Sequence, residues 1–214
     1  MRSRPPARRM LLATFAVAGL AFLAGCSSAP PWLDPSASPA PTSTPTVTRI
    51  PVQNDLAAGS LTRTVQIGAI TLTIDYWSTL TMDLWTADAS KPLSFSIRGT
   101  IAPADGQKLY LSRVTAEPVV RDAAGTQLPG FAAIVDQGTV TPGYLILDPY
   151  SYSQTFTVPP LDPAAASVEL HIKYELLQQS TPTSTDYAKQ TTVDTITIAI
   201  APTPSASPAP SPAE

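Results

Sequence analysis

The stretch Val168-Glu169-Leu170-His171-Ile172-Lys173-Tyr174-Glu175-Leu176-Leu177 decides the fold class. Apolar and polar side chains alternate in it, one by one, over nine consecutive positions. Successive side chains of a β-strand point to opposite faces, so this period of two predicts a strand with one buried and one solvated face. The chain therefore needs at least one sheet that packs on a core through a single face.

The same alternation recurs along most of the chain. It predicts about nine or ten strands in total, at residues 61–67, 70–76, 80–84, 93–97, 109–116, 119–121, 144–147, 154–158, 168–177 and 191–200. Gly68 and Gly125 mark turns, and Pro118 argues for a sheet edge or a bulge because it cannot donate a ladder hydrogen bond.

The spaces between these strands leave no room for the helical crossovers that parallel sheets need. We therefore expect an all-β fold, an antiparallel immunoglobulin-like β-sandwich, with a jelly roll or a closed barrel as the alternatives. The Cys, Trp and Cys landmarks of antibody domains are absent from the sequence, so this expectation rests on periodicity.

The N-terminal segment reads as a targeting peptide. Four arginines precede an apolar run at residues 10–24, which is shorter than the roughly 20 residues of a membrane span. The run ends in Leu23-Ala24-Gly25-Cys26, which resembles the lipobox of bacterial lipoprotein signal peptides. The resemblance implies cleavage before Cys26 and a diacylglycerol on its sulfur; the alternative is an ordinary secretory signal. Arg8-Arg9 leaves the Sec and twin-arginine export routes both open.

Composition divides the chain into four parts. We expect a signal peptide at 1–25, the lipidated Cys26 and a Pro/Ser/Thr-rich linker at 26–51, a β-sandwich domain at 52–201, and a Pro/Ala/Ser-rich tail at 202–214. The linker holds seven prolines and the tail five, half of the 24 in the chain. Such segments cannot bury a core, so both are expected to be disordered.

Charge and cysteine content restrict the partners. Removal of the signal peptide leaves nine basic residues against 16 acidic ones, a formal charge of −7. This surface argues against nucleic acid and against electrostatic attachment to anionic lipid, so membrane attachment must come from diacylglyceryl-Cys26. Cys26 is the sole cysteine, and the domain therefore has no disulfide.

The sequence offers few residues for catalysis or metal binding. His171 is the only histidine and falls on the polar side of its strand, and no nucleophile elbow occurs. We therefore predict no catalytic residue, no metal site and no cofactor. The alternative is a cell-envelope glycan hydrolase that uses Asp75 and Asp83 as a carboxylate pair on neighbouring strands.

Aromatic residues are the better candidates for a binding surface, because amphipathic rings supply much of the energy at recognition sites. Trp77 follows Tyr76, so one of the two must face away from the core. Trp85 falls on the polar side of its expected strand, and Tyr150 and Tyr152 lie near a turn. We expect Trp77, Trp85, Tyr150 and Tyr152 to contribute to a patch for a sugar, peptide or protein; either tyrosine could instead hold a loop through its hydroxyl.

Two further stretches, residues 121–128 (RDAAGTQL) and 148–159 (DPYSYSQTFTVP), resemble the second half of immunoglobulin-like extracellular domains in uncharacterised Gram-positive lipoproteins. The resemblance implies a fold and a setting and carries no activity. Abundant Ala, Pro and Thr favour a high-GC Gram-positive host.

Together these features predict a non-catalytic lipoprotein, anchored in the cell membrane on the extracytoplasmic side, which binds or supports an envelope protein or glycan. A plain spacer is a further possibility, and the oligomeric state is left open.

Overall fold

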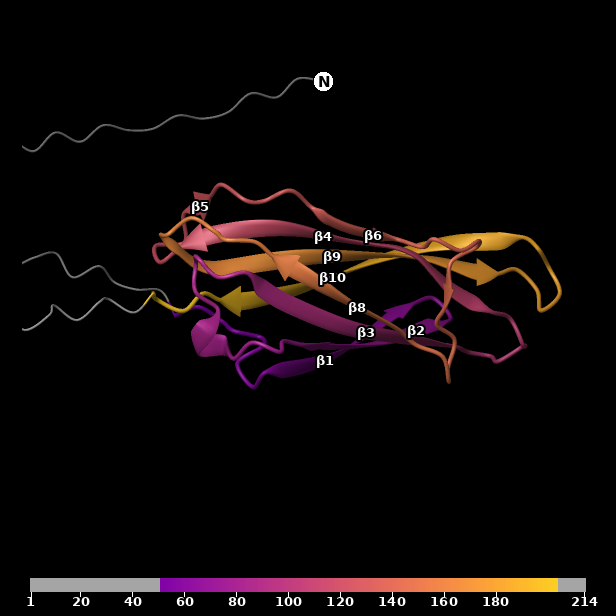
Figure 1. Cartoon of the computed structure of the whole chain (residues 1–214). Helices are drawn as coiled ribbons and strands as arrows, with labels where there is room; N and C mark the ends of the chain where they lie inside the picture. Colours follow the sequence, from indigo (N-terminus) through magenta and orange to yellow (C-terminus); the bar gives the residue numbers. More distant parts are fainter. Residues whose placement is uncertain (1–50, 204–214) are drawn as a thin grey trace, which may run out of the picture. The chain divides into compact units, whose positions relative to one another are not determined.

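The computed structural model describes residues 51–203, which form two antiparallel β-sheets packed face to face (Figure 1). The four-stranded sheet has the order β1-β2-β3-β8, with β1 Ser60–Ile67, β2 Ile70–Trp77, β3 Lys91–Ile101 and β8 Tyr152–Val158. The prediction of an all-β antiparallel sandwich is confirmed.

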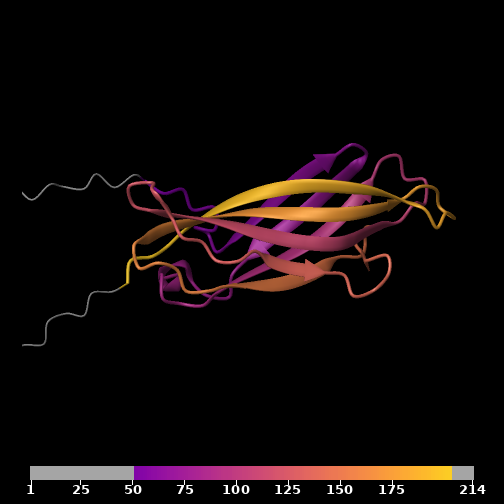
Figure 2. The ribbon, with the colours of Figure 1, turned by 90° about the horizontal axis from the view of Figure 1, so that it is seen from above.

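The second sheet has the order β10-β9-β4, and three short strands pair one after another with the far side of β4. Its members are β4 Leu109–Asp122, β5 Gln127–Leu128, β6 Ile134–Gln137, β7 Tyr144–Leu145, β9 Ala165–Gln179 and β10 Tyr187–Ala199. Strands β2-β3-β8 against β10-β9-β4-β5 give the A-B-E and G-F-C-C′ order of immunoglobulin-like sandwiches, with β1 added beside β2. Figure 2 shows the long strands of the two sheets crossing at an angle.

The period of two seen in the sequence is the period of burial. In β9 the apolar residues of the alternation, from Val168 to Leu176, are at most 1% exposed. In β2, Ile70, Leu72, Ile74 and Tyr76 are fully buried. Both strands lie inside their sheets, β9 between β4 and β10 and β2 between β1 and β3. Burial of alternate residues on two facing sheets is what holds the domain together.

One predicted strand is wrong. Residues 80–84 do not pair with a sheet; they contain the short 3-10 helix η1, Met82–Leu84. Leu80 and Met82 pack against the core, whereas Leu84 is 52% exposed. Three apolar residues at a period of two fit an irregular crossing segment as well as a strand, and here the fully buried Trp85 fixes the segment to the core.

Of the two expectations for Pro118, the sheet edge is confirmed locally and the bulge is wrong. Strand β4 runs through it, and Pro118 is opposite Leu170 of β9. On the other side of β4, pairing with β6 ends at Ala116, and pairing with β5 begins at Val120. Pro118 therefore lies where β4 has no partner on that side, and the irregularities of register fall at Leu111/Arg113 and Arg121/Asp122 instead.

Side chains cover free backbone groups on two sheet edges. In β8 the Thr155 amide donates to Gln154 Oε1 at 2.9 Å, and in β10 the Thr195 amide donates to Asp194 Oδ1 at 2.9 Å. Further along β10, the Thr197 amide donates to Asp55 Oδ2, and the Asp55 amide donates to the Thr197 carbonyl, each at 2.8 Å. Such caps reduce the tendency of an edge to pair with another strand.

A buried polar link joins the two sheets. The hydroxyl of Tyr76 in β2 lies 2.8 Å from that of Tyr174 in β9, and it donates to Asp194 Oδ2 of β10 at 2.9 Å. Because the single hydroxyl proton of Tyr76 goes to Asp194, the proton between the two tyrosines must come from Tyr174. Burial raises the pKa of both tyrosines, so both stay protonated. Phe95 packs edge-on against Tyr174, with ring centroids 6.2 Å apart.

This order of donors predicts unequal effects for two Tyr-to-Phe changes. Tyr76→Phe removes two hydrogen bonds, because the Tyr174 hydroxyl loses its acceptor and Asp194 loses its donor. It should lower the free energy of unfolding by about 2–3 kcal/mol. Tyr174→Phe removes one bond but leaves the Tyr76–Asp194 bond intact, so it should cost about 1 kcal/mol. Urea unfolding measures both, with Tyr187→Phe as the control; equal losses would contradict the assigned order.

Candidate functional site

The outer face of the four-stranded sheet is dominated by hydroxyl groups. Strands β1, β2, β3 and β8 present alternate residues to this face, and eleven of these are Ser or Thr: Ser60, Thr62, Thr64, Thr71, Thr73, Ser94, Ser96, Thr100, Ser153, Thr155 and Thr157. Their neighbours on the face are Gln66, Asp75, Trp77, Pro92 and Arg98. We call these sixteen residues the hydroxyl face.

The strand register places the hydroxyl face in rows that cross the sheet. The row that contains Trp77 runs from Ser60 through Trp77 and Ser94 to Thr155. The next row runs from Thr62 through Asp75 and Ser96 to Ser153. Trp77 is half-buried and is the one aromatic residue of the face, with small side chains on both sides of it.

Two hydrogen bonds between strands hold hydroxyls of this face in place. Thr62 donates to Asp75 Oδ1 at 2.6 Å, and the hydroxyls of Ser94 and Thr155 lie 2.7 Å apart. Cross-strand pairs of this kind stabilise a sheet and fix the rotamers of the residues that make them. The hydroxyls at these positions are therefore ordered rather than freely rotating, and that of Ser94 is buried, with the residue 4% exposed.

The outer face of the other sheet is different in charge. Residues of β4, β9 and β10 there include Arg113, Glu117, Glu169, His171, Lys173, Glu175 and Lys189. These side chains pair among themselves: Lys173 Nζ lies 3.8 Å from Glu175 Oε1, and His171 Nε2 lies 2.9 Å from Glu169 Oε1. The hydrogen bond from Lys189 holds the pKa of Glu175 below its ordinary value. On the hydroxyl face, by contrast, Asp75 and Arg98 are the only ionisable residues, and their formal charges cancel.

The structure separates the four aromatic residues that the sequence singled out. Of the Tyr76 and Trp77 pair, Tyr76 points into the core and Trp77 lies on the hydroxyl face. Trp85 is 0% exposed, so it cannot belong to a surface patch, and this expectation is wrong. The physical reason is η1, which breaks the alternation on which the position of Trp85 was judged.

Trp85 instead fastens the crossing segment between β2 and β3. Its Nε1 donates to Ser78 Oγ at 3.0 Å, and Ser78 Oγ donates to the Pro92 carbonyl at 2.6 Å. The fully buried Lys91 closes the same segment, because its Nζ donates to the carbonyls of Thr86 at 3.1 Å and Ala89 at 2.6 Å.

Tyr150 and Tyr152 have different surroundings. Tyr150 lies in the turn before β8 and is 59% exposed. Tyr152 stacks on Tyr144 with ring centroids 4.3 Å apart, and its hydroxyl donates to Asp136 Oδ2 at 2.7 Å. Burial, with this hydrogen bond, raises the pKa of Tyr152. Tyr152 thus links β8 of one sheet to β6 and β7 beside the other, which is a structural use of the hydroxyl.

The proposed carboxylate pair does not lie on neighbouring strands. Asp75 is in β2 on the hydroxyl face, where it accepts the bond from Thr62, while Asp83 is exposed in η1. Within residues 51–203, no group of three or more His, Cys, Asp or Glu could hold a metal ion. In the same range no helix is long and apolar enough to cross a membrane. Cys26 lies outside the described residues.

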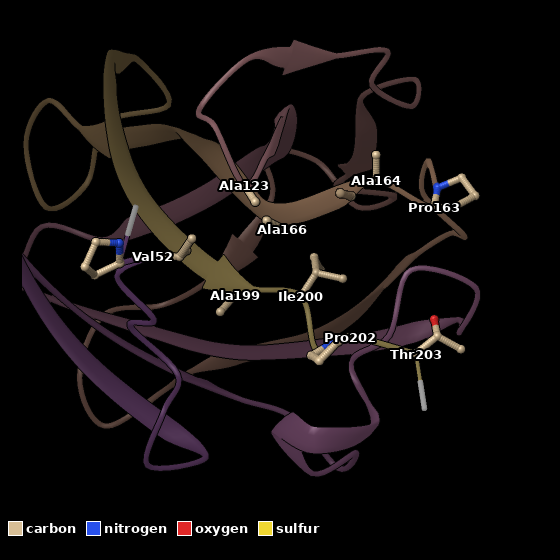
Figure 3. A pocket seen from close by; sticks show the side chains of 11 residues that line it. Val52, Ala123, Pro163, Ala164, Ala166, Ala199, Ile200, Pro202 and Thr203 are labelled. Carbon is tan, nitrogen blue, oxygen red and sulfur yellow. The ribbon is translucent and has the colours of Figure 1, made fainter. Parts of the chain in front are cut away.

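A cavity of about 650 Å³ lies at the end of the sandwich where the domain begins and ends (Figure 3). Small apolar residues dominate its wall, which consists of Pro51, Val52, Ala123, Pro163, Ala164, Ala165, Ala166, Ala199, Ile200, Pro202 and Thr203. The first and last residues of the domain therefore lie at one end. None of these eleven side chains is ionisable, so the cavity offers no acid or base for catalysis.

Comparison with known proteins adds no family. No protein-family model matches the sequence, and no curated protein matches it. Eleven chains of solved structures match. One is the X-ray structure of Northeast Structural Genomics Consortium target SoR45, which is 12% identical with a TM-score of 0.31; the match covers 74% of this chain and 98% of that one.

Sequence reasoning missed the hydroxyl face, although its signal was present. The polar positions of residues 61–67, 70–76 and 93–97 are mostly Thr and Ser. That these segments are neighbours in one sheet, in a register that aligns their hydroxyls, comes only from the structure.

The different surroundings of the two tryptophans predict different costs of removal. Trp85→Ala empties a fully buried site and should lower the free energy of unfolding by about 3–5 kcal/mol. Trp77→Ala, on the outer face, should cost about 1 kcal/mol. Urea unfolding monitored by circular dichroism measures both changes. A loss for Trp77→Ala that equals the loss for Trp85→Ala would show that Trp77 serves the core.

Proposed function

We propose that this chain is a membrane-anchored, extracytoplasmic lipoprotein without catalytic activity, and that its sandwich binds an envelope or extracellular partner. The partner contacts the hydroxyl face. The membrane contact is made by diacylglyceryl-Cys26 and not by the domain.

The anchoring part of the proposal rests on the sequence. The Leu23-Ala24-Gly25-Cys26 motif follows a basic and then an apolar segment, as in lipoprotein signal peptides. The Pro-rich linker after Cys26 can hold the domain up to about 70 Å from the bilayer if it is extended. Residues 51 and 52 and residues 202 and 203 line the same cavity, so the described part of the domain begins and ends at one end of the sandwich.

The observation that carries the binding part is the hydroxyl face with Trp77 in it. Most of its hydroxyls are accessible to solvent, Ser94 at 4% exposure being the exception, and a half-buried tryptophan stands among them. The charged face of the other sheet satisfies many of its charges internally, and capped edges do not favour strand addition. The hydroxyl face is therefore the surface whose groups remain available to a partner.

The anchor is tested by acyl labelling in cells. Cys26→Ala should abolish incorporation of a labelled fatty acid and block cleavage before residue 26, because the sulfur is the only acceptor that the motif provides. Ser28→Ala is the matched control and should be labelled as the wild type is. Labelled lipid on the Cys26→Ala protein would overturn the anchoring scheme.

The binding surface is tested by mild crosslinking on intact cells followed by purification from membranes. We expect the wild-type protein to capture a partner, Trp77→Ala to lose at least most of it, and Tyr150→Ala to retain it. Capture that is unchanged in Trp77→Ala would contradict a role for the hydroxyl face.

A cleavage assay tests the alternative function. If a purified envelope glycan is cleaved by the wild type and not by a folded Asp75→Asn variant, the protein is a hydrolase instead.

A further inference from the structure

We infer that the ligand of the hydroxyl face is a neutral polysaccharide, held by Ser and Thr hydroxyls and by stacking of a sugar ring on Trp77. This inference rests on the proposed binding role of the face and names the chemical class of its partner.

The hydrogen-bonding groups of the face match those of a sugar. A Ser or Thr hydroxyl both donates and accepts, as does each hydroxyl of a carbohydrate, so many relative positions give a satisfied pair. Thr64 and Thr73 are cross-strand neighbours on the face, and both lie free of the side-chain hydrogen bonds that engage Thr62 and Ser94. Their hydroxyls can therefore exchange water for a ligand.

The charge of the face selects against an ionic ligand. Asp75 and Arg98 occupy neighbouring rows and cancel in formal charge. An anionic polymer would need a cluster of basic groups, and a cationic one would need a cluster of acids. One of the two Asp75 carboxylate oxygens already accepts a hydrogen bond from the Thr62 hydroxyl. A polymer without charge fits this surface best.

Trp77 supplies the apolar part of the site. Its two neighbours in the row, Ser60 and Ser94, have small side chains, and Trp77 is only partly buried. An indole face attracts weakly positive C–H groups through its quadrupole. A sugar ring has such C–H groups on its flat face and hydroxyls around its rim. It can therefore stack on Trp77 while its rim contacts the neighbouring hydroxyls.

The same features disfavour a protein partner. The centres of protein interfaces are apolar, enriched in aromatic residues and Arg, and depleted in Ser. The hydroxyl face has the reverse composition apart from Trp77 and Arg98. From Trp77 to Thr71 the outward residues of β2 extend over about 20 Å, at roughly 3.4 Å per residue. This long, regular array suits a chain of repeating sugar units.

The inference is tested with the purified full-length lipoprotein in detergent and immobilised polysaccharides. Cellulose, xylan, mannan and amylose are the neutral probes, and alginate and heparin are the anionic ones. We expect binding to at least one neutral probe and to neither anionic probe. Trp77→Ala should weaken that binding about tenfold, and Thr64→Val with Thr73→Val about fivefold.

Matched variants control for folding and for nonspecific loss of aromatic or hydroxyl groups. Tyr150→Ala removes an exposed aromatic residue outside the face, and Thr191→Val with Thr195→Val removes two hydroxyls from the outer face of the other sheet. Both should bind within about twofold of the wild type, and every variant is compared at an equal fraction folded.

Binding to none of the neutral probes, or equal binding by Trp77→Ala, overturns the inference. If Trp77-dependent crosslinking to an envelope protein persists in that case, the proposed function stands with a different partner. If the crosslinking is also independent of Trp77, the proposed function fails as well.

Discussion

The hydroxyls of Tyr76 and Tyr174 form a hydrogen bond between the two sheets, and the Tyr76 hydroxyl donates a second hydrogen bond to Asp194. The domain contains no cysteine, so polar links such as this one and the apolar contacts around them set one sheet against the other. Since a strand alternates between its faces, an inward Tyr76 requires an outward Asp75 and Trp77. The buried link thereby determines which residues the protein presents to solvent on the opposite side of the same sheet.

The two outer faces are built from the same kind of strand but differ in chemistry. On the sheet of β4, β9 and β10, acids and bases alternate and pair with each other. On the sheet of β1, β2, β3 and β8, hydroxyls replace those charges and one tryptophan interrupts them. Stability needs only polar residues on such a face, and either set would serve. Thr is favoured in strands and hydroxyls pair across them, so stability accounts for part of this composition; the binding role that we propose concerns the hydroxyls around Trp77.

Much of the sandwich could be predicted from the sequence, because burial on one face imposes a period of two that is visible in β2 and β9. The same rule predicted that Tyr76 and Trp77 point in opposite directions. It failed at Trp85, since a three-residue 3-10 helix before it shifts the alternation without any proline or glycine to signal the change. Asp83 was misplaced for the same reason. Pro118 was correctly expected at an edge, since one side of β4 is unpaired there, but the gap between β5 and β6 that creates this edge is not revealed by the pattern. The hydroxyl face required the pairing of segments distant in sequence, such as Ser94 with Thr155.

Oxidative footprinting with hydroxyl radicals tests the central claim, that the hydroxyl face is occupied in the native envelope, and it works whichever ligand the face binds. The modification rates of Trp77 and Tyr150 are compared between intact cells and the purified full-length protein, both read out by mass spectrometry. Tyr150, exposed and outside the face, serves as the internal reference. We predict that Trp77 is protected on cells relative to the purified protein while Tyr150 is modified equally in both. Equal modification of Trp77 in the two settings would contradict the account.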